Sequence, residues 1–252
     1  VALPRARRIG VYNSNGNRVG QIPLGSLTPP NTAKKLYSFG ALSDIHLQYD
    51  TAQADFQRAL TYLNDTEDVA FTCIAGDLTD NGEATDLQTH ADYVSSYSKD
   101  TPVYAITGNH DVRSGLQNSI ATYTGKPLYY SFTHNDDVFI MMGVNKEAQG
   151  SLFTTEQLQW FYETLEANRN KRCFVFHHVR PQDGCGNALG IYTYDIWGGT
   201  EATVFESLMH HYINVHQFHG GSSGMWRCQQ QQEADSPRPD RYHLCIRLQK
   251  TL

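Results

Sequence analysis

The sequence predicts a layered α/β fold, and three observations support that prediction. Four short apolar runs each end in a cluster of Asp, Asn or His residues. Segments with the helical spacing of apolar residues follow several of these runs, and another pair of apolar runs flanks a polar turn. Strands that alternate with helices pack as sheets covered by helices, so a layered architecture is expected. The four runs are Leu36–Leu42, Phe71–Ala75, Val103–Thr107 and Cys173–Phe176.

Helices are expected where apolar residues recur every three or four positions. These segments are Thr51–Leu63, Asp86–Tyr97, Thr154–Asn168 and Glu201–Tyr212. The third segment opens with Thr-Thr-Glu-Gln, which is similar to a capping box. Two further strands, Leu128–Phe132 and Val138–Met142, are expected to form an antiparallel pair around the turn Asn135-Asp136-Asp137.

Composition divides the chain into three segments. Residues 1–35 place Asn15-Gly16 between two alternating runs, which indicates a β-hairpin, and a Pro-rich linker follows. Residues 36–220 contain the apolar runs and the helical segments, and form the main domain. Residues 221–252 are rich in Gly, Ser, Gln and Pro and are expected to form an atypical tail, in which Tyr242–Leu248 has the pattern of a strand.

Length and charge exclude several classes of protein. A chain of 252 residues with 15 Tyr and 11 Phe suits one sizeable domain with a packed core. A formal net charge of −6 argues against a nucleic-acid-binding surface. No run of about 18 apolar residues is present, so no membrane span is predicted. Scarce Lys beside frequent Asn, Gln, Ser and Thr favours an extracellular, envelope or virus-associated location.

The five cysteines do not follow a zinc-binding pattern. No Cys-x-x-Cys spacing is present, which argues against a structural zinc site. Cys73 and Cys173 lie inside predicted strands and are expected to be buried as small apolar groups. Cys185, Cys228 and Cys245 lie in loops or in the tail, and the sequence leaves open whether any of them form a disulfide.

The polar clusters that end the four runs predict a metal site. They are Asp44 with His46, Asp77 with Asp80, Asn109-His110-Asp111, and His177-His178. Alternation along an extended segment places Asp44 and His46 on one side. If the runs share a sheet, the clusters meet at one edge, where open α/β sheets bind ligands. Neighbouring carboxylate and imidazole groups suit a divalent metal ion.

In this order the motifs resemble those of the calcineurin-like metallophosphoesterases. The motifs are Asp-x-His at 44–46, Gly-Asp-x-x-Asp-x-Gly at 76–82, Gly-Asn-His-Asp at 108–111, and His after a strand at 177–178. The resemblance covers residues 37–220. It implies a four-layer α-β-β-α sandwich of two mixed sheets packed face to face, with helices outside. It also implies two divalent metal ions, and the mixed oxygen and nitrogen ligands suit Mn, Fe or Zn.

The resemblance implies a metal-binding role for five residues. Asp77 bridges the two ions, and Asp44 and His46 complete the first. Asn109 and one histidine of the His177-His178 pair serve the second. Many members of the family read His-His-Pro-Pro with the first histidine as ligand, which favours His177. Others read His-x-Pro-Pro, and aligning Pro181 with the second proline of that motif favours His178, which is chosen here. Asp80 is expected to be a loop cap.

Two residues are expected to take part in catalysis. The resemblance implies that His110 lies over the substrate phosphate, beside Asn109, and assists the leaving group as an acid or charge stabiliser. Asp111 is expected to orient His110, since carboxylates that bond to an imidazole fix its direction.

One family motif is altered in this chain. The family ends its site with Gly-His-x-His, and here Gly221 and Ser223 stand where the two histidines are expected. His219 precedes this point and is a candidate sixth ligand. The altered motif predicts a weakened metal site.

The leading functional hypothesis is a metal-dependent phosphoesterase that hydrolyses phosphomonoesters or phosphodiesters. The alternative is a catalytically weakened or inactive relative that binds a phosphorylated ligand or serves in a larger assembly. The intact first motifs favour the enzyme, and the altered last motif favours the alternative. A dinucleotide-binding fold is set aside because no Gly-x-Gly-x-x-Gly follows the first strand.

Overall fold

The computed structural model describes most of the main domain and parts of both ends. The described residues are 8–12, 18–23, 34–48, 51–145, 152–181, 196–197, 200–212, 214–220 and 243–250. The chain forms two compact units, residues 1–37 with 247–252, and residues 38–246. In the smaller unit, β1 (Arg8–Tyr12) and β2 (Arg18–Pro23) pair antiparallel, with Ile9 opposite Ile22. This is the hairpin that Asn15-Gly16 indicates.

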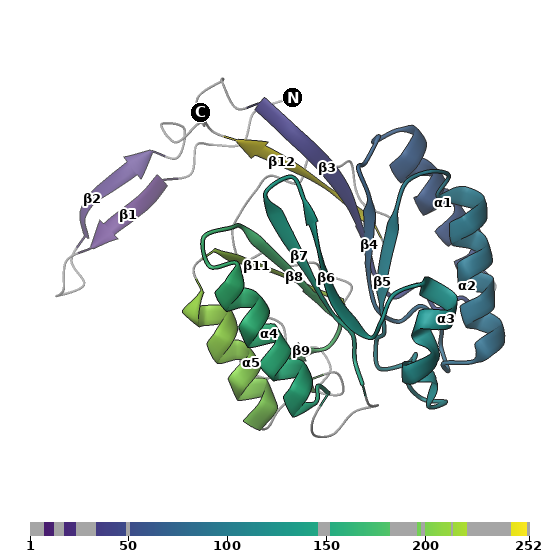
Figure 1. Ribbon diagram of the computed structural model, residues 1–252. Coiled ribbons are helices and arrows are strands. Elements are labelled where there is room, and N and C mark those ends of the chain that lie inside the picture. Colours follow the sequence, from purple (N-terminus) through teal and green to yellow (C-terminus); the bar gives the residue numbers. More distant parts are fainter. Residues whose placement is uncertain are drawn as a thin grey trace. The chain divides into compact units, whose positions relative to one another are not determined.

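The first sheet of the larger unit has the strand order β12-β3-β4-β5. Strands β3 (Lys34–Leu42), β4 (Thr72–Ala75) and β5 (Val103–Ile106) run parallel, and β12 is His243–Lys250. Parallel neighbours need crossover connections, and helices provide them. Helix α1 (Ala52–Asp65) joins β3 to β4, and α2 (Ala84–Tyr97) joins β4 to β5. Figure 1 shows both helices on the same outer face of this sheet.

Apolar spacing explains why these helices pack as they do. Helix α1 buries Phe56, Ala59, Leu60 and Leu63, which recur every three or four residues and so share one face. These side chains join one cluster with Ile74 of β4 and other residues of the sheet. A 3₁₀ turn, η2 (Leu116–Ser119), and the short helix α3 (Ile120–Thr124) follow β5; neither was predicted.

The second sheet has the order β11-β8-β7-β6. Strands β6 (Tyr129–His134) and β7 (Asp137–Met142) form the expected antiparallel pair, and β7, β8 (Cys173–His177) and β11 (Val215–His219) run parallel. Helix α4 (Thr155–Ala167) joins β7 to β8, and α5 (Thr200–His211) precedes β11. Thr154 caps α4 as predicted, because its hydroxyl accepts a hydrogen bond from the Gln157 N–H at 3.1 Å. Strands β9 (Arg180–Pro181) and β10 (Ile196–Trp197) form a short parallel pair.

Alternation in the strands separates two apolar layers. In β7, Val138, Ile140 and Met142 join the cluster that packs against α4 and α5. Phe139 points the other way, between the sheets, where its ring lies 5.2 Å from that of Phe39 of β3. Other rings fill the same layer, and aromatic pairs of this kind stabilise a fold by roughly 0.5–1.5 kcal/mol each beyond their burial. They belong to Phe71, Phe132, Phe174, Phe176 and Phe218.

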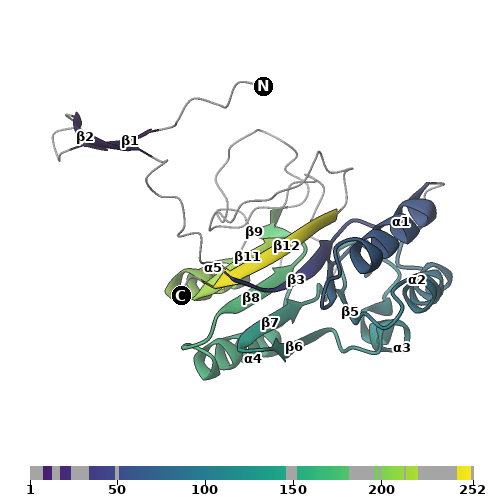
Figure 2. The ribbon, with the colours of Figure 1, turned by 90° about the horizontal axis from the view of Figure 1, so that it is seen from above.

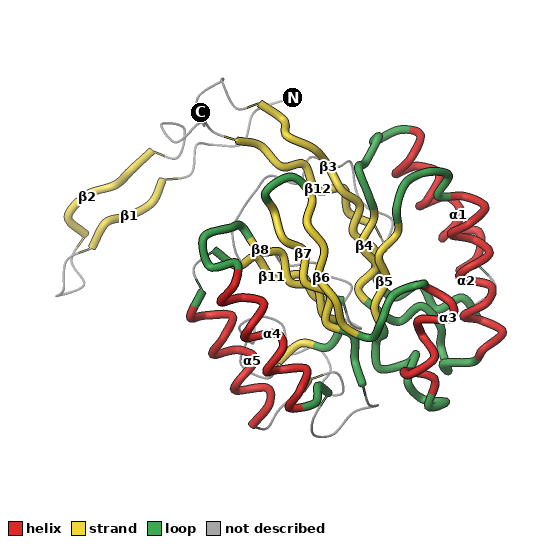
Figure 3. Tube along the Cα trace, in the orientation of Figure 1, coloured by secondary structure: helices red, strands yellow, loops and turns green. Residues whose placement is uncertain are grey.

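The larger unit therefore has two sheets with helices outside, which confirms the predicted fold class. Figure 2 shows α1 and α2 beside β3–β5, and α4 and α5 beside β6–β8 and β11. In Figure 3 the loops that leave β3, β4 and β5 are drawn in green. Cys73 and Cys173 are buried and free, as expected of strand residues. No helix in the described part of the chain combines the length and the apolar character that crossing a bilayer requires.

Candidate metal centre

Four loops of the larger unit carry the predicted site residues. They follow β3, β4, β5 and β8, which belong to both sheets. The loops supply Asp44 and His46, then Asp77 and Asp80, then Asn109, His110 and Asp111, and finally His178. Residues more than 130 positions apart along the chain therefore meet in one place, as the contacts below show.

The Asp77 carboxylate is the centre of this site. Its Oδ2 lies 3.0 Å from His178 Nε2, 3.6 Å from His46 Nε2 and 4.0 Å from His110 Nε2. Asp44 belongs to the same cluster, because its Oδ1 lies 3.9 Å from His46 Nε2. The other oxygen of Asp77 accepts a hydrogen bond of 2.9 Å from the backbone N–H of His110. Three imidazoles and a second carboxylate thus surround a carboxylate that is 3% exposed.

The backbone at this site turns through left-handed conformations. Asp44, His46 and Asp77 have φ angles of 56°, 45° and 52°. For residues other than glycine such angles are sparsely populated, cost about 1–3 kcal/mol each, and gather at functional sites. Asp44 and His46 therefore do not lie on an extended segment, which corrects the prediction from alternation.

Backbone hydrogen bonds hold the two turns in place. The N–H groups of Asp44 and His46 donate to the carbonyls of Gly76 and Asp77, both at 3.1 Å, and Leu47 donates to Leu78 at 3.2 Å. The turn after β3 is therefore fixed against the turn after β4. This pairing brings Asp44 and His46 to Asp77.

Two glycines make room for the site. At Gly108 a Cβ atom would overlap the Asp77 carboxylate and lie 2.8 Å from a ring carbon of His178. At Gly220 a Cβ atom would overlap the Ser43 hydroxyl and lie 2.8 Å from His178 Nδ1. The close approach of the four loops depends on the missing side chains at these positions.

Burial and charge fix the ionisation of the central pair. Burial alone raises the pKa of Asp77, but the positive charges of His178, His110 and His46 and the hydrogen bond from His178 bring it below its usual value. Burial lowers the pKa of His178, and the charge of Asp77 outweighs this effect and raises it. The imidazole of His178 also contacts the Ala75 carbonyl through Nδ1 at 2.7 Å. Without a cation, the two groups form a buried ion pair.

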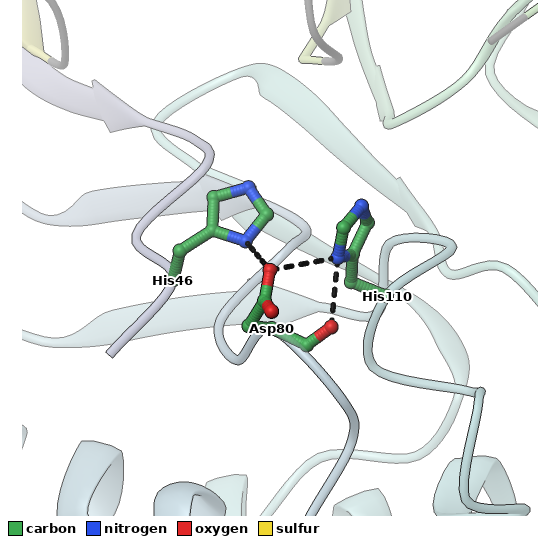
Figure 4. Close-up of side chains that lie close together, drawn as sticks. All are labelled: His46, Asp80 and His110. Carbon is green, nitrogen blue, oxygen red and sulfur yellow. Dashed lines mark hydrogen bonds and ion pairs between the residues drawn. The ribbon is translucent and has the colours of Figure 1, made fainter. Parts of the chain in front are cut away.

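Asp80 lies between two of the site histidines (Figure 4). Its Oδ1 is 3.3 Å from His46 Nδ1 and 3.1 Å from His110 Nδ1, and its backbone carbonyl is 2.7 Å from the same His110 nitrogen. Arg113 completes the group, with Nη1 donating to the Asp80 carbonyl at 2.9 Å and Nη2 lying 3.1 Å from His110 Nε2. The sequence placed Asp80 in a motif with Asp77 and favoured a loop cap over a metal role for it; its contact with His110 was not predicted.

Asp111 is arranged differently from the prediction. Its carboxylate accepts hydrogen bonds from the backbone N–H groups of Leu78, Thr79 and Gly108 and from the Thr79 hydroxyl, at 2.7–3.1 Å. Within the described residues, none of these bonds reaches the His110 imidazole. Burial and the charge of Asp77 raise the pKa of Asp111 to about 6, against the effect of its hydrogen bonds. Asp111 therefore ties the turn after β4 to the turn after β5, and the contact with His110 comes from Asp80.

The structure separates the two neighbouring histidines after Phe176. His178 faces Asp77, whereas His177 continues the helix-facing side of β8, two residues after Val175. His177 Nδ1 contacts the Val179 carbonyl at 3.1 Å, and Gln217 Nε2 donates to His177 Nε2 at 2.7 Å. The ring of His177 also packs against Phe205 of α5.

The two remaining candidates are placed less fully. Asn109 is buried between Gly108 and His110, both of which contact Asp77. His219 ends β11 opposite His177, and its side chain lies outside the described residues. Gly221 and Ser223, on which the prediction of a weakened site depends, also lie outside them.

Two overlapping groups of side chains have the spacing of metal ligands. One is Asp44, His46 and Asp77, and the other is His46, Asp80 and His110. In each group, one ligand atom per residue lies within 4.8 Å of the others. His46 belongs to both groups through its two ring nitrogens. Mixed carboxylate and imidazole ligands are the set that Mn, Fe and Zn prefer over Ca.

The family of the chain follows from a comparison with models of known protein families. The model of the calcineurin-like phosphoesterases matches residues 37–226, about three quarters of the sequence. The chain belongs to this calcineurin-like phosphoesterase family. The match covers all the loops described above, so the predicted family resemblance is confirmed. A comparison with curated proteins found no significant match.

Two solved structures resemble the calcineurin-like chain weakly. One is a purple acid phosphatase from yellow lupin (Lupinus luteus) seeds, with 14% identity and a TM-score of 0.42; the alignment covers 57% of this chain and 30% of that one. The other is a protein of unknown function from Aquifex aeolicus, with 13% identity and a TM-score of 0.33, covering 67% of this chain and 92% of that one. The chain thus spans less than a third of the lupin phosphatase.

Proposed function

We propose that this calcineurin-like chain hydrolyses phosphomonoester or phosphodiester bonds with two divalent metal ions. The observation that carries the proposal is the convergence of His46, His110 and His178 on the buried Asp77 carboxylate. A carboxylate held this way supplies the negative charge that a cation requires, and the imidazoles supply nitrogen ligands. Membership of the phosphoesterase family supports the same chemistry.

The residues present fit such ions. Asp44, His46 and Asp77 supply one ligand group, and we assign Asn109 and His178 to the second position. The left-handed turns hold these side chains before any ion arrives, which reduces the reorganisation that binding requires. When bound, divalent ions at such a site lower the pKa of coordinated water and neutralise charge on the phosphoryl oxygens.

Asp80 and His110 supply the proton transfer. His110 Nδ1 lies against the Asp80 carboxylate and carbonyl, so this nitrogen carries a hydrogen that both oxygens accept. Nε2 is then the atom directed toward Asp77, at 4.0 Å, and toward Arg113. We assign the donation of a proton to the oxygen of the leaving alcohol to Nε2 of the imidazolium form, in which both ring nitrogens carry a hydrogen; in that form Arg113 Nη2, which can only donate, moves away from Nε2. Asp80 is a positioning residue, because it acts by fixing the ring of His110.

Metal content and turnover test this proposal together. Purified protein loaded with Mn²⁺ is expected to hold two equivalents of metal and to hydrolyse p-nitrophenyl phosphate or bis(p-nitrophenyl) phosphate. Asp77→Asn is expected to lose both properties, because it removes the central charge. Asp65→Asn is the matched control, since Asp65 is an exposed carboxylate that pairs with Lys99 away from the site. Full metal loading and turnover in Asp77→Asn would refute the proposal.

A second test separates Asp80 from Asp111. Asp80→Asn is expected to lower kcat by about 10- to 100-fold with little change in KM. Asp111→Asn is expected to lower the melting temperature instead, because its amide nitrogen would face backbone N–H donors. Equal kinetic losses in both variants would contradict the assignment of roles.

An inactive binding module is the second candidate function. The presence of Gly221 and Ser223 in place of the family's last two histidines favours it. For this candidate, the metal-loaded protein binds inorganic phosphate or a phosphorylated ligand with no turnover of either nitrophenyl ester. The same measurements therefore choose between the two functions.

A further inference from the structure

A cavity of about 280 Å³ lies between the end of β3 and the first two turns of α1. Its floor is apolar and consists of Leu42, Phe56 and Ala59, which are at most 3% exposed. Thr51 and Asp55, at the beginning of α1, contribute polar atoms to the wall. The cavity is therefore an apolar pocket with a few polar groups, which is the usual composition of a small-molecule site.

The same cavity shares a wall with the candidate metal centre. Asp44 and His46 line it, and both belong to the cluster around Asp77. Leu42 and Phe56 line the same cavity as these two side chains. The cavity is thus placed to receive the organic part of a phosphate ester.

Size and charge narrow the class of that organic group. An apolar cavity of about 150 Å³ holds a benzene ring, and drug-sized ligands need about 300 Å³ or more, so this cavity fits a group of one or two rings. Asp55 and Asp44 are carboxylates on its wall, and they disfavour a second anionic group there. A chain of further phosphates is therefore a poor occupant, and a compact uncharged ring is a good one.

We propose that this cavity is the leaving-group pocket of the enzyme and that it selects phosphate esters of compact, uncharged cyclic or aromatic alcohols. The inference rests on the proposed function. In the reaction, the oxygen of water bonds to phosphorus, the bond from phosphorus to the alcohol oxygen breaks, and that oxygen takes a proton. The released alcohol then occupies the pocket between β3 and α1 until it leaves.

Filling the cavity tests the inference. Ala52, the first residue of α1, and Ala59 both line it, so Ala52→Leu and Ala59→Leu place side chains in the pocket at two depths. For 1-naphthyl phosphate we expect kcat/KM to fall by about tenfold or more, because the ring no longer fits. For methyl phosphate we expect a change within about twofold, since the methyl group does not reach the cavity. Ala84→Leu is the matched control, because Ala84 is the exposed first residue of α2.

Binding of the product alcohol gives a readout that needs no turnover. In ligand-observed NMR with Mn²⁺-loaded protein, 1-naphthol is expected to bind the wild type and Ala84→Leu but neither cavity variant. If 1-naphthol binds all four proteins equally, or none of them, the pocket assignment is overturned. If the wild type hydrolyses neither ester yet binds 1-naphthol as expected, the proposed function fails and the ring-binding pocket stands. Equal loss of kcat/KM for both esters in a variant that melts like the wild type also overturns the assignment.

Discussion

His90 makes the stability of this protein sensitive to acid. It lies on α2, is 2% exposed, and stacks on Phe56 of α1 with ring centroids 5.3 Å apart. Neither ring nitrogen has a hydrogen-bond partner among the described residues. Burial lowers the pKa of His90 from its ordinary value of 6.5 to about 4. Between these values the folded protein holds His90 neutral while the unfolded chain binds a proton.

The sign and size of the effect follow from this difference in proton binding. Because the unfolded state binds more protons between pH 6.5 and 4, the free energy of unfolding falls as the pH falls through that range. At 1.36 kcal/mol per pH unit, the protonation of His90 in the unfolded chain lowers the free energy of unfolding by about 2 kcal/mol between pH 7 and pH 5, and by about 3 kcal/mol by pH 4. His90→Leu abolishes this loss, since leucine does not titrate.

Urea unfolding at pH 7, 6 and 5 measures the effect. The difference in unfolding free energy between His90→Leu and wild type is expected to shift by about 2 kcal/mol in favour of the variant from pH 7 to pH 5. His210→Leu is the matched control for the same change of side chain at an exposed position, because His210 is exposed on α5. A constant difference between His90→Leu and wild type across these pH values would refute the reasoning.

Three further changes test the site and the framework around it. Gly108→Ala is expected to abolish Mn²⁺ binding in a protein that still folds, measured by metal content and circular dichroism, because its methyl group overlaps the Asp77 carboxylate. Arg172→Met removes the two hydrogen bonds, of 2.8 and 2.6 Å, that Arg172 donates to the buried Asp137 carboxylate, and should lower the free energy of unfolding by about 3–5 kcal/mol in urea titrations. Thr154→Ala removes the cap of α4 and should lower the free energy of unfolding by about 1 kcal/mol, whereas Thr154→Ser keeps the hydroxyl and should leave that free energy unchanged.

Much of the fold and the cluster followed from local pattern. Thr154 was predicted to cap α4 because a hydroxyl three residues before Gln157 can bond to its N–H, an interaction that needs no distant partner. Asp44 and Asp77 were expected to meet because parallel strands end at the same edge of a sheet, and β3 and β4 share one sheet. His178 follows β8 of the second sheet, so the expectation that all four runs share one sheet was wrong for His178. Such rules predict contacts between residues that are close in the sequence, and contacts that follow from the shared direction of parallel strands.

Other features depend on contacts that the sequence does not show. The left-handed angles of Asp44 and His46 arise from hydrogen bonds to Gly76 and Asp77, more than 30 residues away, so alternation described that segment wrongly. Asp111 was expected to orient His110, yet its carboxylate accepts three hydrogen bonds from the turn after β4 and one from Gly108 in its own turn. Long-range backbone bonds of this kind need three-dimensional coordinates.

The left-handed residues at the candidate centre limit how this protein can be made more robust. Glycine accepts such backbone angles without steric conflict, so glycine at Asp44, His46 or Asp77 removes strain together with the side chain. Variants chosen for heat resistance alone should therefore accumulate changes at Asp44 and His46, while the ring layer around Phe39 and Phe139 stays intact and Asp77 is retained by its buried ion pair with His178. Screens for thermal stability therefore need a simultaneous selection for metal binding, because otherwise they will select against the side chains of the candidate metal centre.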